Sequence, residues 1–247
     1  MNPLVILGAS FIRLSLGLTG AGGSIITLPV LVYLAGVAPK EAVGMSLFVV
    51  GSAAAVGALH RIRSGEVHFK AAILFILAGT LGAAGGAKLT HLISGHVLMF
   101  IFALLMLVIA GTTLLRGAKD EPANPDAFKI SSCFGAGLGV GILTGFIGVG
   151  GGFLLMPALV KFARLPTRIA TGTSLAVISF NSASGFLAHF HDAPPRWDLA
   201  LLFASLAAVG VLVGTAFAAK LPVVRLGQIF AFMTLTTGCY VLWQSLR

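Results

Sequence analysis

The stretch GVGGGFLLMPAL, Gly148–Leu159, decides the fold because the chain carries it twice. At an offset of 128 residues it matches GAGGSIITLPVL, Gly20–Leu31, so that Pro157 falls on Pro29. The match continues without a gap, since five further positions, Lys40, Ala42, Gly44, Ser46 and Leu47, align with Arg168, Ala170, Gly172, Ser174 and Leu175. The sequence therefore predicts two repeats, 1–116 and 130–247, joined by a polar linker at 117–129 that holds two prolines and three acids.

The composition places both repeats in a membrane. Of the 247 residues, 57% are hydrophobic and only 9% are charged, and the mean hydropathy is +1.04. Soluble domains are less apolar and carry about 25% charged residues. The net charge of +9 is explained by basic loops facing the cytoplasm, so we expect no nucleic-acid partner. The lipid bilayer is the expected surroundings of one polytopic domain, 1–247.

Six apolar runs are long enough, with their flanks, to cross a bilayer. They lie at about 44–59, 71–87, 97–115, 175–188, 199–219 and 223–242. Two further regions, 4–36 and 130–165, are too long for one span, and the glycine clusters at 20–23 and 148–152 interrupt them. The pieces on either side have the length of short spans or of re-entrant half-helices, and the sequence leaves both readings open.

The basic residues decide how these broken regions are counted. If each region goes in and comes back, one side keeps Lys40, Lys88, Arg196 and Arg247, and the other side receives the other eleven Lys and Arg residues of the loops. That asymmetry is the one expected when basic loops face the cytoplasm, and it places both termini in the periplasm. We therefore predict an all-α integral membrane protein of two inverted repeats. Each repeat has a glycine-broken in-and-out helix pair and three transmembrane helices, giving about ten helical segments.

The two glycine clusters are the predicted substrate site. Inverted repeats with broken helices bind substrate where the breaks meet, and a helix N-terminus with glycine backbone suits an anion. The candidate residues are Gly20, Gly22, Gly23, Ser24, Gly148, Gly150, Gly151 and Gly152. The alternative is that these glycines only permit a tight turn. All seven acidic residues lie at span ends or in loops, which disfavours a carboxylate-lined cation path.

Polar side chains near the start of the second long helix of each repeat complete the candidate set. Ser46, Thr173, Ser174 and Asn181 could donate to an oxyanion, or they could bond to helix carbonyls and fill packing faces. Arg13 lies roughly 13 Å into the first segment, where it either binds the anion or reaches back to the surface. The histidines lack the further ligands of a zinc site, so we expect no metal and no cofactor.

The paired glycine segments, together with ATGTSLAVISFNSASG at Ala170–Gly185, resemble the sulfite exporter TauE/SafE family over about residues 4–242. The resemblance implies a bacterial inner-membrane transporter of small sulfur-containing anions, such as sulfite, thiosulfate, sulfoacetate and related organosulfonates. It implies a site at the glycine breaks and the Ser46 and Thr173–Ser174 regions. The first repeat departs from the second, with Ser24 aligned to Gly152 and Met45 to Thr173.

We expect a secondary transporter working by alternating access, with an anion channel of the same architecture as the alternative. A proton or another ion could be coupled to transport, and an oligomer is possible. An intramembrane hydrolase using Ser174 and His189 is disfavoured, because 15 residues on one helix separate these side chains by about 22 Å.

Overall fold

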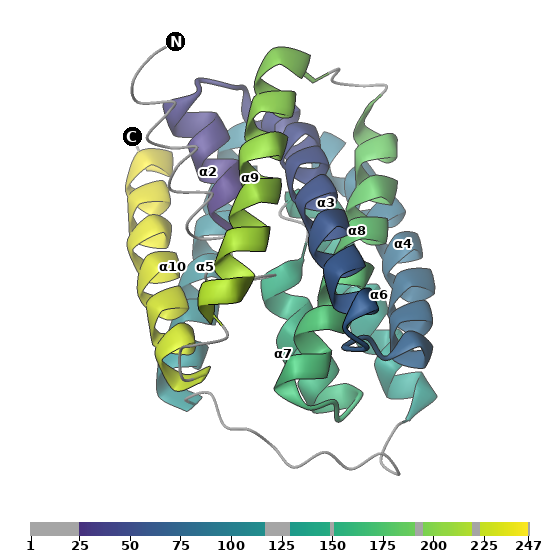
Figure 1. The fold of residues 1–247 in the computed structure, drawn as a ribbon. Coiled ribbons are helices and arrows are strands. Elements are labelled where there is room, and N and C mark those ends of the chain that lie inside the picture. Colours follow the sequence, from purple (N-terminus) through teal and green to yellow (C-terminus); the bar gives the residue numbers. More distant parts are fainter. Residues whose placement is uncertain (1–24, 117–128, 149–150, 191–194, 219–222, 247) are drawn as a thin grey trace.

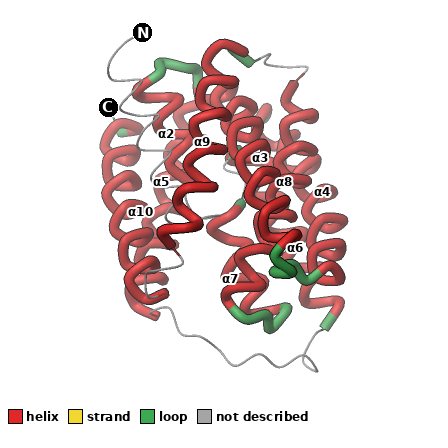
Figure 2. Tube along the Cα trace, viewed as in Figure 1, coloured by secondary structure: helices red, strands yellow, loops and turns green. Residues whose placement is uncertain are grey.

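The structure is a computed structural model that describes residues 25–116, 129–148, 151–190, 195–218 and 223–246, and all its elements are helices (Figure 2). The first half of the chain contributes α2 (Thr27–Pro29), continued by the π-helical turn η2 (Val30–Leu34), α3 (Pro39–Arg63), α4 (Phe69–His91) and α5 (Gly95–Arg116). The second contributes α6 (Ile130–Ile147), α7 (Gly152–Phe162), α8 (Thr167–Phe190), α9 (Trp197–Ala218) and α10 (Val223–Ser245).

The six predicted spans all fall on these helices, apart from Ala219, which lies outside the described residues. Within the described residues, five helices are long and apolar enough to cross a membrane, namely α3, α4, α5, α6 and most of α9. Large apolar side chains such as Leu81 and Phe232, which are 64% and 66% exposed, face outward from the bundle. The all-helical membrane fold expected from the composition is confirmed.

The helices of the two halves begin at matched positions and run in opposite directions. α3, α4 and α5 begin at Pro39, Phe69 and Gly95, and α8, α9 and α10 begin 128 residues later, at Thr167, Trp197 and Val223. In Figure 1, α3 runs from the upper end of the molecule to the lower end, whereas α8 runs from the lower end to the upper end. This is the arrangement that inverted repeats require.

The long helices α3 and α8 cross in the middle of the bundle, and their contacts follow the same offset. A Cβ on Gly57 would lie 3.2 Å from Cδ1 of Leu175, and a Cβ on Gly185 would lie 3.1 Å from Cδ1 of Leu47. The two contacts are equivalent under the repeat offset, because Gly57 aligns with Gly185 and Leu47 aligns with Leu175, 128 residues apart in each case. Gly51 packs on Ser182 of α8, so this small residue serves packing within one chain.

Backbone contact between α4 and α6 depends on glycine on both helices. A Cβ on Gly82 or Gly86 would clash with the backbone of α6, and a Cβ on Gly141 or Gly145 would clash with the backbone of α4. Small residues let membrane helices approach this closely, and the gain in van der Waals contact holds them together. α6 therefore packs along most of α4, up to Thr90, whose hydroxyl donates to the Phe146 carbonyl at 2.7 Å.

The second broken region is an in-and-out helix pair. α6 ends at Ile147, α7 begins at Gly152, and the Sγ of Cys133 near the start of α6 donates to the carbonyl of Phe162 at the end of α7 (3.3 Å). Both outer ends of the pair thus lie on the same side, and the predicted break at 148–152 is confirmed. The first broken region lies largely in residues 1–24, and the linker mostly in 117–128, both outside the described residues.

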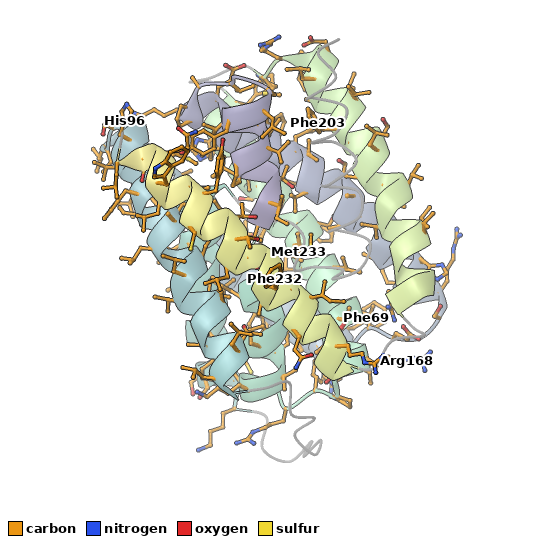
Figure 3. The ribbon with its side chains drawn as sticks, turned by 90° about the vertical axis from the view of Figure 1, so that its left-hand side faces the viewer. Phe69, His96, Arg168, Phe203, Phe232 and Met233 are labelled. Atoms are coloured by element: carbon orange, nitrogen blue, oxygen red, sulfur yellow. The ribbon has the colours of Figure 1, made fainter. Side chains whose placement is uncertain are left out.

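The bundle has one end rich in basic residues, which we call the basic end. Within the described residues it carries Arg61, Arg63, Lys70, Arg116, Lys129, Lys161, Arg164, Arg168 and Arg225, against Lys40, Lys88 and Arg196 at the opposite end. Figure 3 shows Arg168 and Phe69 together at the basic end and His96 at the opposite end.

Candidate functional site

Two glycines in left-handed backbone conformations shape the break between α6 and α7. Gly148 ends α6 with φ +78°, and Gly151 precedes α7 with φ +64°. L-residues with a side chain rarely adopt such angles. A Cβ on Gly148 would lie 2.7 Å from the Cα of Val43, and a Cβ on Gly151 would clash with the Thr144 hydroxyl. The close packing alone requires glycine at both positions, so the tight-turn interpretation has direct support.

The break lies against α3 and α8, the helices that carry the predicted hydroxyl and amide groups. Gly148 contacts Val43 on α3, and the carbonyl of Gly145 is 3.0 Å from Nε2 of His189 on α8. Ser46 follows Val43 by one turn on α3, and Asn181 precedes Gly185, which faces Gly145, by one turn on α8. The structure thus brings Ser46, Asn181 and the second glycine cluster into one region of the bundle.

Several side chains in this region are fully buried without a hydrogen-bond partner among the described residues. They are the hydroxyls of Ser46 and Ser182 and both amide atoms of Asn181. The Asn181 amide occupies a notch at Gly79 of α4, where a Cβ would collide with it. A buried amide without partners costs about 1–3 kcal/mol, so a native protein keeps one where a ligand or water completes its bonds.

Thr173 and Ser174 have partners in the protein. The Oγ1 of Thr173 accepts from the backbone N–H of His68 (3.0 Å), and the Ser174 hydroxyl donates to the carbonyl of Thr171 (2.8 Å). Ser174 also lies 11 residues before Gly185, about 16 Å along α8, so it is not beside the α6–α7 break. These contacts favour the structural alternative for both hydroxyls.

The other predicted site residues have different outcomes. Gly152 is the first residue of α7 and is buried. Arg13, Gly20, Gly22, Gly23, Ser24 and Gly150 lie outside the described residues. Sequence reasoning missed Ser182 and Thr27, which are both buried and whose hydroxyls have no partner in the part of the chain that the structure describes. A serine beside Asn181 in an apolar run carries no signal that separates ligand contact from packing.

Sequence reasoning also missed an ion cluster at the basic end. Glu66, between α3 and α4, pairs with Arg61 at the end of α3 and with Arg168 in the first turn of α8, whose Nε donates to Oε1 at 2.6 Å. Burial by itself raises the pKa of Glu66, but hydrogen bonds and charge from the two guanidinium groups outweigh it and lower the pKa below its ordinary value. The carboxylate is therefore ionised at neutral pH.

Glu66 is the only buried acid among the described residues, and it lies outside the helices. Glu41 and Asp198 lie in the first turns of α3 and α9. In the part of the chain that the structure describes, the interior around the break is thus lined by neutral donors and acceptors.

Comparison with known proteins identifies the family. The family described as sulfite exporter TauE/SafE matches residues 5–241, nearly the whole chain. The chain belongs to the TauE/SafE family.

Relatives of this TauE/SafE protein are described as transporters. A probable membrane transporter protein of Xylella fastidiosa is 35% identical over 239 residues, covering 94% of this chain and 91% of its own. The probable membrane transporter protein YunE of Bacillus subtilis is 25% identical over 253 residues, covering 93% of each chain. No solved structure matches the chain. The protein is thus a multi-pass membrane transporter of the TauE/SafE family.

Proposed function

We propose that this protein is a secondary transporter that moves a small sulfur-containing anion across the bacterial inner membrane by alternating access. The substrate class is an organosulfonate such as sulfoacetate, or sulfite or thiosulfate. Membership of the TauE/SafE family supports the transport function and the substrate class. One structural observation supports the location of the site, namely the buried amide of Asn181, which has no hydrogen-bond partner among the described residues.

The polar groups that the described residues contribute to this region are neutral donors and acceptors, which suit an anion, and the candidate cation Arg13 lies outside the described residues. Asn181 offers two N–H donors, and Ser46 and Ser182 each offer one O–H donor. An oxyanion that leaves water needs several such donors, since a buried acceptor without partners is costly.

The two halves are proposed to be inverted repeats that move relative to each other around this site. The 128-residue offset of the helix starts and the matched contacts Gly57–Leu175 and Gly185–Leu47 support this symmetry. Symmetric halves allow two equivalent states, one open to each side, which is the basis of alternating access.

Catalysis is not part of the proposal. Ser174 and His189, the only nucleophile and base considered, bond to different carbonyls, those of Thr171 and Gly145. A serine nucleophile needs its base within hydrogen-bond reach.

Counterflow in proteoliposomes tests the transport function and the substrate class together. Labelled sulfoacetate is supplied outside, with unlabelled sulfoacetate, sulfite, thiosulfate or chloride trapped inside. We expect a trapped sulfur anion to drive saturable uptake of the label. Uptake that does not saturate, accompanied by a chloride current, would establish the channel alternative.

The variant Asn181→Ala separates a ligand contact from a packing role. Because the amide has no partner among the described residues, its removal breaks no hydrogen bond that the structure describes, and thermal unfolding of the same variant measures the cost of the cavity that it leaves beside Gly79. We expect counterflow to fall at least tenfold, equivalent to the loss of about 1.4 kcal/mol of binding. Ser205→Ala on the exposed face of α9 is the matched control. Full activity of Asn181→Ala would refute the site.

A further inference from the structure

The ion cluster at the basic end connects the two halves of the molecule. Arg61 and Glu66 belong to the first half and Arg168 to the second. The loop that carries Glu66 also contacts α8 through its backbone. The His68 N–H donates to Thr173 at 3.0 Å, and a Cβ on Gly172 would clash with the Glu66 carbonyl oxygen. Residues 64–68, which we call the latch loop, therefore bind to the first two turns of α8 at the basic end.

The two guanidinium groups of the cluster carry more positive charge and more N–H donors than the single Glu66 carboxylate neutralises. Two guanidinium groups, permanently charged, face one carboxylate, so the formal charge of the cluster is positive. The Nε of Arg61 is buried and donates to none of the described residues. The Arg168 side chain is 78% exposed, whereas that of Glu66 is 11% exposed, so the cluster is open to solvent on the Arg168 side.

The residues of the cluster are not repeated in the other half of the sequence. The positions 128 residues from Glu66, Arg61 and Arg168 are Pro194, His189 and Lys40. The Glu66 carboxylate therefore has no counterpart at the aligned position, and His189 bonds to the Gly145 carbonyl.

We propose that the transported anion competes with the Glu66 carboxylate for binding to Arg61 and Arg168. When the anion displaces Glu66 from the two guanidinium groups, the latch loop is released from α8. An oxyanion with two or three oxygen atoms matches the fork of donors on each guanidinium as a carboxylate does. The released loop opens the basic end, and departure of the anion lets Glu66 close it again. The inference rests on the proposed function only in taking the arriving anion to be the substrate.

Amide hydrogen exchange of the purified full chain in detergent tests this displacement without measuring transport. The readout is a peptide spanning the latch loop, whose Glu66 and His68 N–H groups bond to the Arg61 carbonyl (3.0 Å) and to Thr173. Sulfoacetate or thiosulfate is titrated against chloride at matched ionic strength, since salt alone screens exposed ion pairs. We expect the sulfur anions to speed exchange of the loop about fivefold, a ratio in keeping with loss of a partly exposed ion pair, and chloride to have little effect.

Two variants and one control complete the experiment. In Glu66→Gln the loop exchanges fast without anion, and sulfoacetate adds nothing. In Arg168→Gln, a change at an exposed side chain that folding tolerates, the response to sulfoacetate is lost. Asp198→Asn breaks the pair with Arg196 (4.0 Å) at the opposite end and should respond like the wild type.

The outcomes separate this inference from the proposed function. Saturable counterflow with loop exchange that sulfur anions leave unchanged, or that chloride speeds equally, overturns the latch while the transport function stands. A response of the loop to sulfur anions that disappears in Glu66→Gln and Arg168→Gln supports the latch. If that response occurs without counterflow, the latch stands and the proposed transport function fails.

Discussion

Individual glycines in this protein differ in their importance for stability. The difference depends on whether a Cβ at the position would clash with a neighbouring helix. On α6, Gly145 faces the backbone of Ala83, whereas Gly139 faces open space. Both look alike in the sequence, since each lies in the same glycine-rich run, Gly135–Gly145. Only the position of α4 distinguishes them.

A pair of substitutions on α6 tests this distinction. Gly145→Ala would force a Cβ against the Ala83 carbonyl oxygen, so we expect a loss of about 1–3 kcal/mol or more as α4 and α6 separate. Gly139→Ala meets nothing within 4 Å and should leave stability unchanged or raise it by about 0.5–1 kcal/mol, because alanine favours a helix. Thermal unfolding in one detergent measures both. Equal midpoints for the two variants would contradict the packing of α4 on α6.

The pH dependence of thermal stability should show how much the ion pairs of Glu66 stabilise the protein. Its folded-state pKa is lowered, so its ion pairs stabilise the protein fully above the ordinary value of about 4.3 and less as the pH falls through the folded-state pKa. We expect the unfolding temperature of wild type to exceed that of Glu66→Gln by a constant amount from pH 8 to about pH 5. The difference should shrink at lower pH. A difference that does not vary with pH would show that the Glu66 charge is not what stabilises the loop.

At the scale of helices, apolar run length and glycine position predicted most of the fold. The six long runs lie on helices, and the cluster at Gly148–Gly152 separates α6 from α7. What the sequence could not predict are contacts between distant elements. In the sequence, the charges of Glu66, Arg61 and Arg168 look like ordinary loop and helix-end charges. Only the packing of α8 beside the end of α3 brings them together as ion pairs. Likewise, Thr173 and Asn181 are both polar residues of α8, and only the structure shows that Thr173 bonds to the His68 N–H whereas Asn181 bonds to none of the described residues.

Cysteine labelling tests the in-and-out pair formed by α6 and α7. Lys129 precedes α6 and Lys161 lies in the last turn of α7, so cysteines at both positions should react with a membrane-impermeant maleimide from the same side. Lys88→Cys on α4 should react from the opposite side. Each variant is made without Cys133 and Cys239, and labelling is compared in intact and permeabilised vesicles. Reaction of the Lys129 and Lys161 positions from opposite sides would show that the pair is a single crossing.

At the scale of the whole molecule, the two ends differ in chemistry. The basic end carries most of the described Lys and Arg residues, whereas the two tyrosines and two tryptophans, Tyr33, Tyr240, Trp197 and Trp243, lie toward the opposite end. Tyr33 and Tyr240 meet edge to face at 5.6 Å, joining η2 to α10. Amphipathic rings anchor a protein at the lipid–water interface, and basic loops remain on the cytoplasmic side. Both features specify how the bundle sits in a bilayer.

Reporter fusions test that orientation. The C-terminal end of α10 lies opposite the basic end (Figure 1), so a reporter after Arg247 should be periplasmic. We expect alkaline phosphatase fused there to be active and green fluorescent protein to be dark, with the reverse for fusions after Arg116 at the end of α5. Replacing basic residues of the 117–129 linker is the weaker test, since the other basic loops remain. A fluorescent C-terminal fusion would show that the orientation is opposite to the expected one, with the latch loop in the periplasm. In that case, the Glu66 cluster would bind anions that arrive from outside the cell.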